Sequence, residues 1–361
     1  MGIIVRQSLK NNIITAVGVF IGFLNILIIQ PFVLSPNELG LIRLLFSIST
    51  LFASIFPLGL NVFTLKFFPY IKNSRNGHNG FLGFLLLSSS ILFVLVSFFF
   101  YYYKSEFLLK YSNSALFINH FDYIFPLSYF LGVFSLLTSY SSSIFKSTFP
   151  SFLNEIILRI FIVISIGLYY IKLISFEVLI NIYILSYLLI IILLINYFKK
   201  TDTINFKINW GIFKIIPIKE ALKFTFIMSV TTLASISIKN IDSAFIGSYL
   251  GLAEVAVYTI AFTISSMIDV PGNALAKIIV PKISEAFKNN DMNFVKNVYY
   301  KSTRVSIIVG SLIFLLIFTN AHEILSILPQ KYGEGQHVLK IIAVGSFINS
   351  ISGLNFCVIQ Y

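Results

Sequence analysis

Long apolar segments alternate with short polar loops along almost the whole chain. A helix needs about 20 mainly apolar residues to cross the hydrocarbon core of a bilayer, which is about 30 Å thick. The pattern therefore predicts an all-α, polytopic membrane protein with about ten transmembrane helices, of which the second is long enough to be tilted or broken. The predicted ranges are 13–30, 41–69, 81–103, 123–145, 152–171, 176–197, 221–247, 253–279, 303–319 and 338–358.

The composition agrees with a membrane location. Hydrophobic residues make up 57% of the 361 residues and charged residues only 11%, which is too few charges for a water-soluble surface. Arg6 and Lys10 precede the first apolar segment, as basic residues do in a secretory signal peptide. That segment is too long for a signal core and lacks a small-residue cleavage site, so we interpret it as a retained first helix.

The net charge of +12 follows the predicted topology. Most basic residues fall at inner helix ends and loops if the N-terminus is cytoplasmic, as the positive-inside rule requires. We therefore expect a multi-pass protein of the inner (plasma) membrane with a cytoplasmic N-terminus and no nucleic-acid partner. The inner set includes Lys72, Arg75, Lys146, Lys199, Lys200, Lys207, Lys282 and Lys301, and the outer set is Lys104, Lys110, Lys172, Lys331 and Lys340.

Two stretches of the chain are similar and indicate an internal repeat. Residues 34–43 read LSPNELGLIR and residues 250–258 read LGLAEVAVY, each at the outer entry to an inward-running helix. Prolines follow Glu38 after 19 and 31 residues, and they follow Glu254 after 17 and 27 residues. Two copies that run in the same direction would be related by an axis along the membrane normal. The alternative is a chance likeness between two long helices that each contain a proline.

The repeat predicts a two-lobe organisation. Residues 1–200 form an N-terminal six-helix lobe, and residues 201–219 form a basic cytoplasmic linker. Residues 220–361 form a C-terminal lobe with four helices, in which the partners of helices five and six are absent. The second lobe is therefore expected to be truncated.

Several segments resemble the oligosaccharide flippase family of polysaccharide exporters, within the multidrug/oligosaccharidyl-lipid/polysaccharide exporter superfamily. The resemblance implies two six-helix lobes that rock around a central cavity. This chain departs from that pattern because it stops after ten helices. The segments that carry the resemblance are 4–10, 34–43, 67–69, 241–247, 250–251, 254–258 and 279–284.

Ionisable residues inside spanning segments are candidate functional residues, because a charge in the bilayer costs several kcal/mol unless it faces water or a partner. Arg43 lies about one turn inside the second helix, where it could bind a phosphate or reach the interface. Glu155 and Arg159 are four residues apart and favour a structural ion pair. Lys239 and Asp242 are three apart and could pair likewise, with Asp242 anchoring its helix near an outer gate.

Further candidates lie near the inner ends of helices two and eight. Lys66 and Lys277 occupy matching places where an anionic headgroup would enter, although ordinary positive-inside flanking also explains them. Asp269 precedes Pro271, and a proline inside a helix frees a carbonyl and can mark a hinge. The candidate substrate-binding residues are Arg43, Lys66, Arg159, Lys239 and Lys277, and the candidate coupling or gating residues are Asp242, Asp269 and Pro271.

The leading functional hypothesis is a flippase that moves a polyprenyl diphosphate-linked oligosaccharide across the bacterial inner membrane by alternating access. Such a protein would serve the biosynthesis of surface polysaccharide, such as lipopolysaccharide O-antigen. Its partners would be the anionic lipid-linked oligosaccharide, membrane lipids and other polysaccharide-assembly membrane proteins. No cofactor, metal ion or catalytic residue is expected.

Other classes remain as alternatives. A membrane enzyme of the same pathway would need a large soluble loop or an acidic metal motif, and the longest outer loop, 104–122, is too short to build such a site. A multidrug exporter of the same superfamily would be expected to carry an acidic residue in helix one, and residues 13–30 contain none. A lipid II flippase or an inactive fragment is the remaining alternative.

Overall fold

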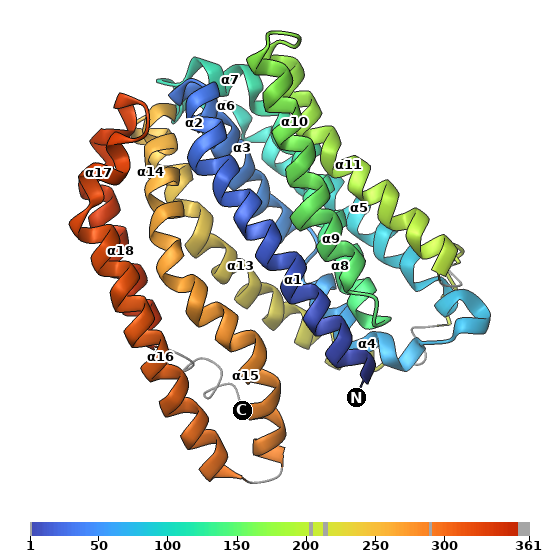
Figure 1. Ribbon diagram of the computed structural model, residues 1–361. Coiled ribbons are helices and arrows are strands. Elements are labelled where there is room, and N and C mark those ends of the chain that lie inside the picture. The colour runs from blue at the N-terminus through green and yellow to red at the C-terminus, as the bar shows by residue number, and fades with distance from the viewer. Residues whose placement is uncertain (1, 202–204, 212–215, 289–290, 353–361) are drawn as a thin grey trace. The chain divides into compact units, whose positions relative to one another are not determined.

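The computed structural model describes residues 2–201, 205–211, 216–288 and 291–352, and every regular element in these ranges is helical, as predicted (Figure 1). The α-helices of the first part are α1 (Gly2–Leu24), α2 (Gln30–Val33), α3 (Pro36–Ile55), α4 (Leu60–Ile71), α5 (Phe81–Tyr102), α6 (Lys104–Leu109), α7 (Ala115–His120), α8 (Ile124–Ser143), α9 (Thr148–Phe152), α10 (Leu158–Tyr170) and α11 (Phe176–Thr201). Those that follow are α13 (Ile218–Tyr249), α14 (Leu252–Ser265), α15 (Val270–Lys288), α16 (Met292–Thr319), α17 (Ala321–Ser326) and α18 (Gln336–Ser352).

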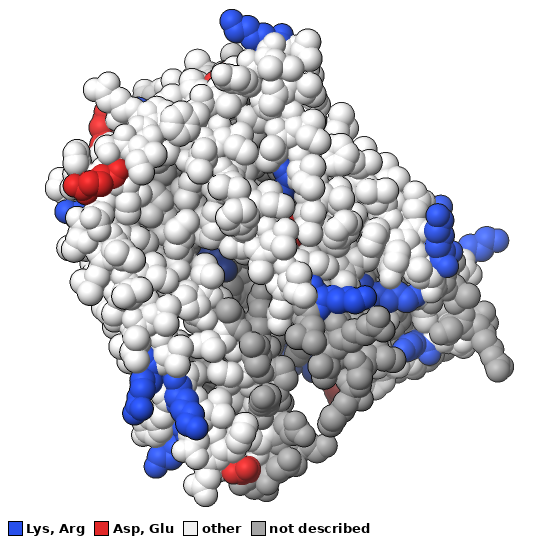
Figure 2. Space-filling model, in the orientation of Figure 1, with Lys and Arg blue, Asp and Glu red and all other residues white. Residues whose placement is uncertain are grey.

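Within these described ranges, nine helical segments are long and apolar enough to cross a membrane. They correspond to the first nine predicted helices, so the chain is a multi-pass membrane protein. The predicted tenth helix begins as α18, and its last part lies outside the described residues. Most of the face shown in Figure 2 carries no charge, as expected for helices that contact lipid.

The second span is broken, which is one of the two possibilities predicted from its length. Helix α3 ends at Ile55, and α4 begins only at Leu60. Pro57 lies between them, followed by Leu58 and Gly59 with φ angles of 42° and 74°. A left-handed backbone favours glycine, and a Cβ atom at Gly59 would lie 2.5 Å from Ser229 Oγ. The proline and glycine together therefore end one helix and start the next.

The eighth span is interrupted at the matching place. Helix α14 ends at Ser265, the turn Ser266–Asp269 is a 3-10 helix, and Pro271 occupies the first turn of α15. Proline is tolerated in a first turn because its missing N–H would have no partner there. The order of the spans therefore recurs, in agreement with the predicted repeat. The first copy consists of α1, the broken span α3–α4, α5 and α8. The second copy consists of α13, the broken span α14–α15, α16 and α18.

The chain divides into two compact units. Unit 1 contains Met1–Asn25 and Val33–Val255, and unit 2 contains Ile26–Phe32 and Ala256–Tyr361. Helix α13 is counted with unit 1 because it packs against α3 and α4. The lobe boundaries expected from the repeat, 1–200 and 220–361, follow sequence similarity and not packing, and they stay a prediction.

Helix α3 lies at the centre of unit 1. It packs against α8 and α13, and α8 also packs against α4 and α11. Leu39, Leu41 and Leu44 on α3 are completely buried, as is Tyr140 on α8. Lipid provides no hydrophobic driving force between helices, so this close packing itself holds the unit together. The first span lies beside α9 and α10 (Figure 1).

In unit 2, α16 packs against both α15 and α18, and α18 contacts the turn Ser266–Asp269 (Figure 1). The Ser265 hydroxyl donates a hydrogen bond to the Leu339 carbonyl at 3.4 Å. A Cβ atom at Gly310 would lie 2.6 Å from Ser350 Oγ, so α16 and α18 approach closely at small residues.

The predicted outer loop, 104–122, is folded. It forms the short helices α6 and α7, with Tyr111, Phe117 and Phe121 buried. The Tyr111 hydroxyl donates a hydrogen bond to the Ala244 carbonyl of α13 at 3.0 Å. These apolar side chains cover the end of unit 1, which explains why a segment with polar residues adopts a fixed structure.

Candidate functional site

An ion pair inside the fifth span joins two residues that the sequence placed on one helix face. Arg159 Nη2 lies 2.6 Å from Glu155 Oε2, and the two side chains are 26% and 20% exposed. Glu155 belongs to the π-helical turn Leu153–Ile157, and Arg159 lies in the first turn of α10. The predicted structural pair is therefore present, and its two charges offset each other where water is scarce.

Arg159 also connects α10 to α1. Its Nη1 donates a hydrogen bond to the backbone carbonyl of Gly18. A Cβ atom at Gly22 would collide with the same nitrogen, so a larger residue there would displace the guanidinium. Gly18 and Gly22 have the G-x-x-x-G spacing that lets membrane helices approach closely. The charge pattern of the sequence does not predict this contact, whereas the glycine spacing does indicate a close helix approach at this place.

Arg43 on α3 lies close to two tyrosines of α11. They are Tyr183 and Tyr187, whose phenols lie near the charge of Arg43. Their ring centroids are 5.8 Å apart, with an interplanar angle of 72°. Both tyrosines are buried, and so is Nε of Arg43. Arg43 is therefore partly buried between helices, with its Nε fully buried, and no sequence pattern predicts its tyrosine neighbours.

Tyr187 lies near both Arg43 and Arg159, so the two arginines share one tyrosine neighbour. We refer to Arg43, Glu155, Arg159, Tyr183 and Tyr187 as the arginine–tyrosine cluster. It combines two positive charges, one negative charge and two phenol hydroxyls. A guanidinium can bind phosphate or carboxylate oxygens in a fixed geometry, and phenols can donate to or accept from sugar hydroxyls. The cluster is therefore suited to an anionic or hydroxyl-rich group.

Glu38 fixes the start of α3, one turn before Arg43. Its Oε2 accepts hydrogen bonds from the backbone N–H and the hydroxyl of Ser35, both at 2.8 Å, in a capping box. Its Oε1 accepts a third hydrogen bond from the Tyr169 hydroxyl of α10 at 2.7 Å. The glutamate of the repeated stretch thus anchors α3 to α10 and helps to position Arg43.

Three other predicted residues of unit 1 are exposed. Lys66 on α4 has its Nζ 3.6 Å from the centroid of the Phe224 ring on α13, a cation–π contact. Lys239 and Asp242 both lie on α13 with exposed side chains. Among the predicted cations of unit 1 whose side chains are described, Arg43 and Arg159 share Tyr187 as a neighbour.

The remaining predicted residues belong to unit 2. Asp269 ends the turn before α15, and its Oδ1 accepts a hydrogen bond from Asn349 Nδ2 of α18 at 2.9 Å. Pro271 is the second residue of α15, so the helix is interrupted just before the proline at which the sequence predicts a hinge. Lys277 is on α15, and its side chain lies outside the described residues. The gating and binding roles of these residues stay predictions.

Comparisons with known proteins find a family match over part of the chain and solved structures with a similar fold. Residues 228–360 match the family model described as MatE. A solved structure of a multidrug resistance MATE family transporter of the MOP superfamily, in an outward-facing conformation, aligns with a TM-score of 0.64 and 14% identity over 98% of this chain and 82% of that chain.

A second structure, MATE in complex with MaD5, aligns with a TM-score of 0.56 and 14% identity, over 98% of this chain and 84% of the other. No curated protein sequence matches the chain. At this level of identity the likeness establishes the fold. The chain has the fold of MATE transporters, and the narrower resemblance to oligosaccharide flippases stays a prediction.

Proposed function

We propose that this chain is a membrane transporter that carries an anionic lipid-linked oligosaccharide, with a polyprenyl diphosphate anchor, across the inner membrane by alternating access. Its fold supports a transporter, and the arginine–tyrosine cluster supports an anionic cargo. The cargo would belong to surface polysaccharide biosynthesis. Other polysaccharide-assembly proteins would be its partners, and the N-terminus would be cytoplasmic.

The observation that carries this proposal is the position of Arg43. An ionisable residue inside a spanning segment is a candidate functional residue, and a guanidinium can bind phosphate oxygens in a fixed geometry. Arg159 is offset by Glu155 at 2.6 Å, which leaves the cluster with one net positive charge. The first span, Lys10–Val33, contains no acidic residue that would attract a cationic drug.

We assign the diphosphate to Arg43 and the neighbouring sugar hydroxyls to Tyr183 and Tyr187. Arg159 would act mainly by holding the helices in place. Lys66, Lys239 and Lys277 would attract the anionic headgroup along its path, and Asp242, Asp269 and Pro271 would serve gating. Binding at Arg43 must be weak enough to allow release on the far side.

A multidrug exporter is the second candidate, and one observation favours it. The first of the two solved structures is a multidrug resistance transporter, and the matched family model is MatE. A cationic drug would require an accessible acidic residue. Asp269, which is partly buried beside Asn349, would be the candidate in unit 2.

Reconstituted full-length protein can distinguish the two candidates. Vesicles would contain a fluorescent polyprenyl diphosphate oligosaccharide, and a membrane-impermeant quencher would report its movement between leaflets. We expect the protein to accelerate this movement, Arg43→Gln to slow it about tenfold or more, and Arg43→Lys to retain part of the rate. A prenyl-linked sugar without the diphosphate should move no faster than in protein-free vesicles.

The matched control is Lys172→Gln, which removes an exposed cation between α10 and α11. It should leave the rate unchanged, and circular dichroism should show that each variant is folded. Export of ethidium from the same vesicles, without movement of the diphosphate lipid, would reject the flippase proposal in favour of the multidrug exporter. Normal lipid movement by a folded Arg43→Gln variant would reject the assignment of Arg43.

A further inference from the structure

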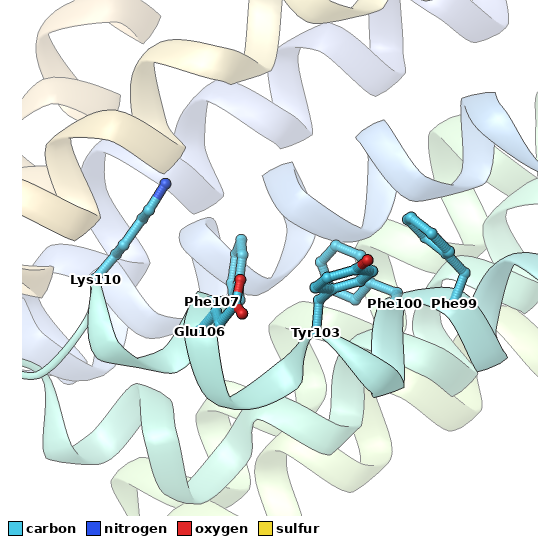
Figure 3. A pocket seen from close by; sticks show the side chains of 6 residues that line it. All are labelled: Phe99, Phe100, Tyr103, Glu106, Phe107 and Lys110. Atoms are coloured by element: carbon cyan, nitrogen blue, oxygen red, sulfur yellow. The ribbon is translucent and has the colours of Figure 1, made fainter.

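A separate pocket lies where α5 ends and α6 begins. It has a volume of about 380 Å³, which is within the range of roughly 300–1,000 Å³ typical of small-molecule sites. Figure 3 shows its six side chains in a row, with Lys110 at one end and Phe99 at the other. The arginine–tyrosine cluster uses α3, α10 and α11, so this pocket is a different site. Its lining residues are Phe99, Phe100, Tyr103, Glu106, Phe107 and Lys110.

The pocket is at the level of the lipid headgroups. The third span ends at Tyr102, so the chain leaves the apolar part of the bilayer there. Phe98 and Tyr102 are 75% and 73% exposed beside the pocket. Tyrosine side chains such as Tyr102 gather at membrane–water interfaces because the ring prefers apolar surroundings and the hydroxyl reaches water. A headgroup from the surrounding leaflet can therefore reach the pocket directly.

Aromatic rings form fixed walls for the pocket. The Phe107 ring packs against Phe100 at 5.2 Å between centroids and against Phe121 at 5.7 Å. Phe121 is completely buried, which holds this wall in place. Phe99 and Tyr103 pair at 5.0 Å on the exposed side. Ring faces attract an ammonium group, so these walls favour a cation over a second anion.

One acidic and one basic side chain complete the pocket. Glu106 and Lys110 are four residues apart, and both are exposed. Among the described residues neither has an ion-pair partner, whereas the neighbouring Lys104 is paired with Asp122 at 2.5 Å. Glu106 and Lys110 are therefore both available to a zwitterion, whose positive group would face Glu106 and whose negative group would face Lys110.

We propose that this pocket binds the headgroup of phosphatidylethanolamine from the bilayer. The ammonium group donates hydrogen bonds to Glu106 and lies against the rings of Phe99 and Tyr103, and the phosphate accepts from Lys110. The acyl chains lie along the exposed apolar surface of α5. Choline has the same charge but no N–H donor, so Glu106 distinguishes ethanolamine from choline.

Native mass spectrometry of the purified full-length protein tests this assignment. The protein would be titrated with phosphatidylethanolamine, phosphatidylcholine or phosphatidylglycerol in detergent. We expect phosphatidylethanolamine to bind most tightly. Glu106→Gln should weaken that lipid roughly two- to fivefold, the range for an exposed charge pair, and leave phosphatidylcholine unchanged. Lys110→Gln should weaken all three lipids, because they share the phosphate.

The control variants are Glu177→Gln and Lys172→Gln, which remove exposed charges at the start of α11 and just before it. Neither should change lipid binding. Equal affinity for phosphatidylethanolamine and phosphatidylcholine, with no effect of Glu106→Gln, would overturn the proposal. Binding of a soluble oligosaccharide that depends on Glu106, without any phospholipid preference, would also overturn it and would assign the pocket to carbohydrate. These measurements involve no transport, so they are independent of the proposed cargo.

Discussion

Replacing Glu155 with glutamine tests how much the ion pair inside the fifth span contributes to stability. The substitution keeps the shape of the side chain but removes its negative charge. Arg159 then keeps its hydrogen bond to the Gly18 carbonyl and loses the carboxylate at 2.6 Å. The positive charge would remain among helices with little compensation, so we expect the free energy of unfolding to fall.

The magnitude follows from burial. Removing one partner of a fully buried pair costs roughly 3–5 kcal/mol, whereas an exposed pair contributes about 0.2–1 kcal/mol. Side chains that are 20% and 26% exposed lie between these limits, which gives about 2 kcal/mol for Glu155→Gln. Arg159→Met should cost about as much, because it also removes the hydrogen bond to Gly18. The double variant has no unpaired charge and should again cost about 2 kcal/mol, instead of the 4 kcal/mol or so of a simple sum.

Unfolding in mixed detergent and SDS micelles, followed by helical circular dichroism, gives the three free energies. The matched control is Asp122→Asn, which breaks a pair with Lys104 in which the aspartate is 71% exposed. That change should cost less than about 1 kcal/mol. If the two effects in the fifth span add within about 0.5 kcal/mol, Glu155 and Arg159 do not act as a coupled pair, and the reasoning is refuted.

Two further changes test other contacts of unit 1. Gly22→Ala should lower the free energy of unfolding by about 1–3 kcal/mol, because the new Cβ would displace Arg159 Nη1 from its hydrogen bond to Gly18. Gly167→Ala, where nothing lies within 4 Å of the new Cβ, should be neutral or stabilise by about 0.5–1 kcal/mol. Equal effects of the two changes in the same unfolding assay would contradict this. Burial raises the pKa of Tyr111 from 10.0 to about 12, so its stabilisation is complete below pH 10 and is lost as the pH rises through 12. The stability difference between wild type and Tyr111→Phe should therefore fall by about 2–3 kcal/mol across that window, and a constant difference would show that Tyr111 does not titrate as a buried phenol.

The membrane spans could be predicted because the bilayer imposes a strict length and polarity on each helix. Backbone groups in lipid must be satisfied within the helix, so each span is a continuous apolar segment that can be seen in the sequence. The break at Pro57 could be anticipated from the length of the second segment. The i, i+4 pair of Glu155 and Arg159 could be predicted as well, because both partners lie on one helix face.

Contacts between distant helices could not be predicted in the same way. Arg43 and Tyr183 are separated by 140 residues, and the periodicity of a helix gives the direction of a side chain but not its neighbour. Membrane helices are apolar on most faces, so the amphipathic pattern that marks the inner face of a soluble helix is weak here. The arginine–tyrosine cluster depends on the arrangement of α3, α10 and α11, which the sequence pattern does not predict.

The sequence predicts the outer segment, residues 104–122, as a loop for a related reason. Helices α6 and α7 have six residues each, too short for a periodic signal. Aromatic residues at the membrane boundary are usually exposed as an interfacial belt. The sequence therefore does not predict that Tyr111, Phe117 and Phe121 are buried. The pocket beside α6 depends on this folded segment, because Phe121 supports its aromatic wall.

The structure separates two roles among the charged residues of unit 1. Glu38 connects α3 to α10 through Tyr169, and Arg159 connects α10 to α1 through Gly18. Changes at these residues should lower stability and transport together, since they alter the position of the cluster. Arg43 faces the two tyrosines and forms neither of these two connections, so its conservative replacement should lower transport with a smaller loss of stability. A comparison of both readouts on the same variants thus separates residues that hold the helices from the one that we assign to the cargo.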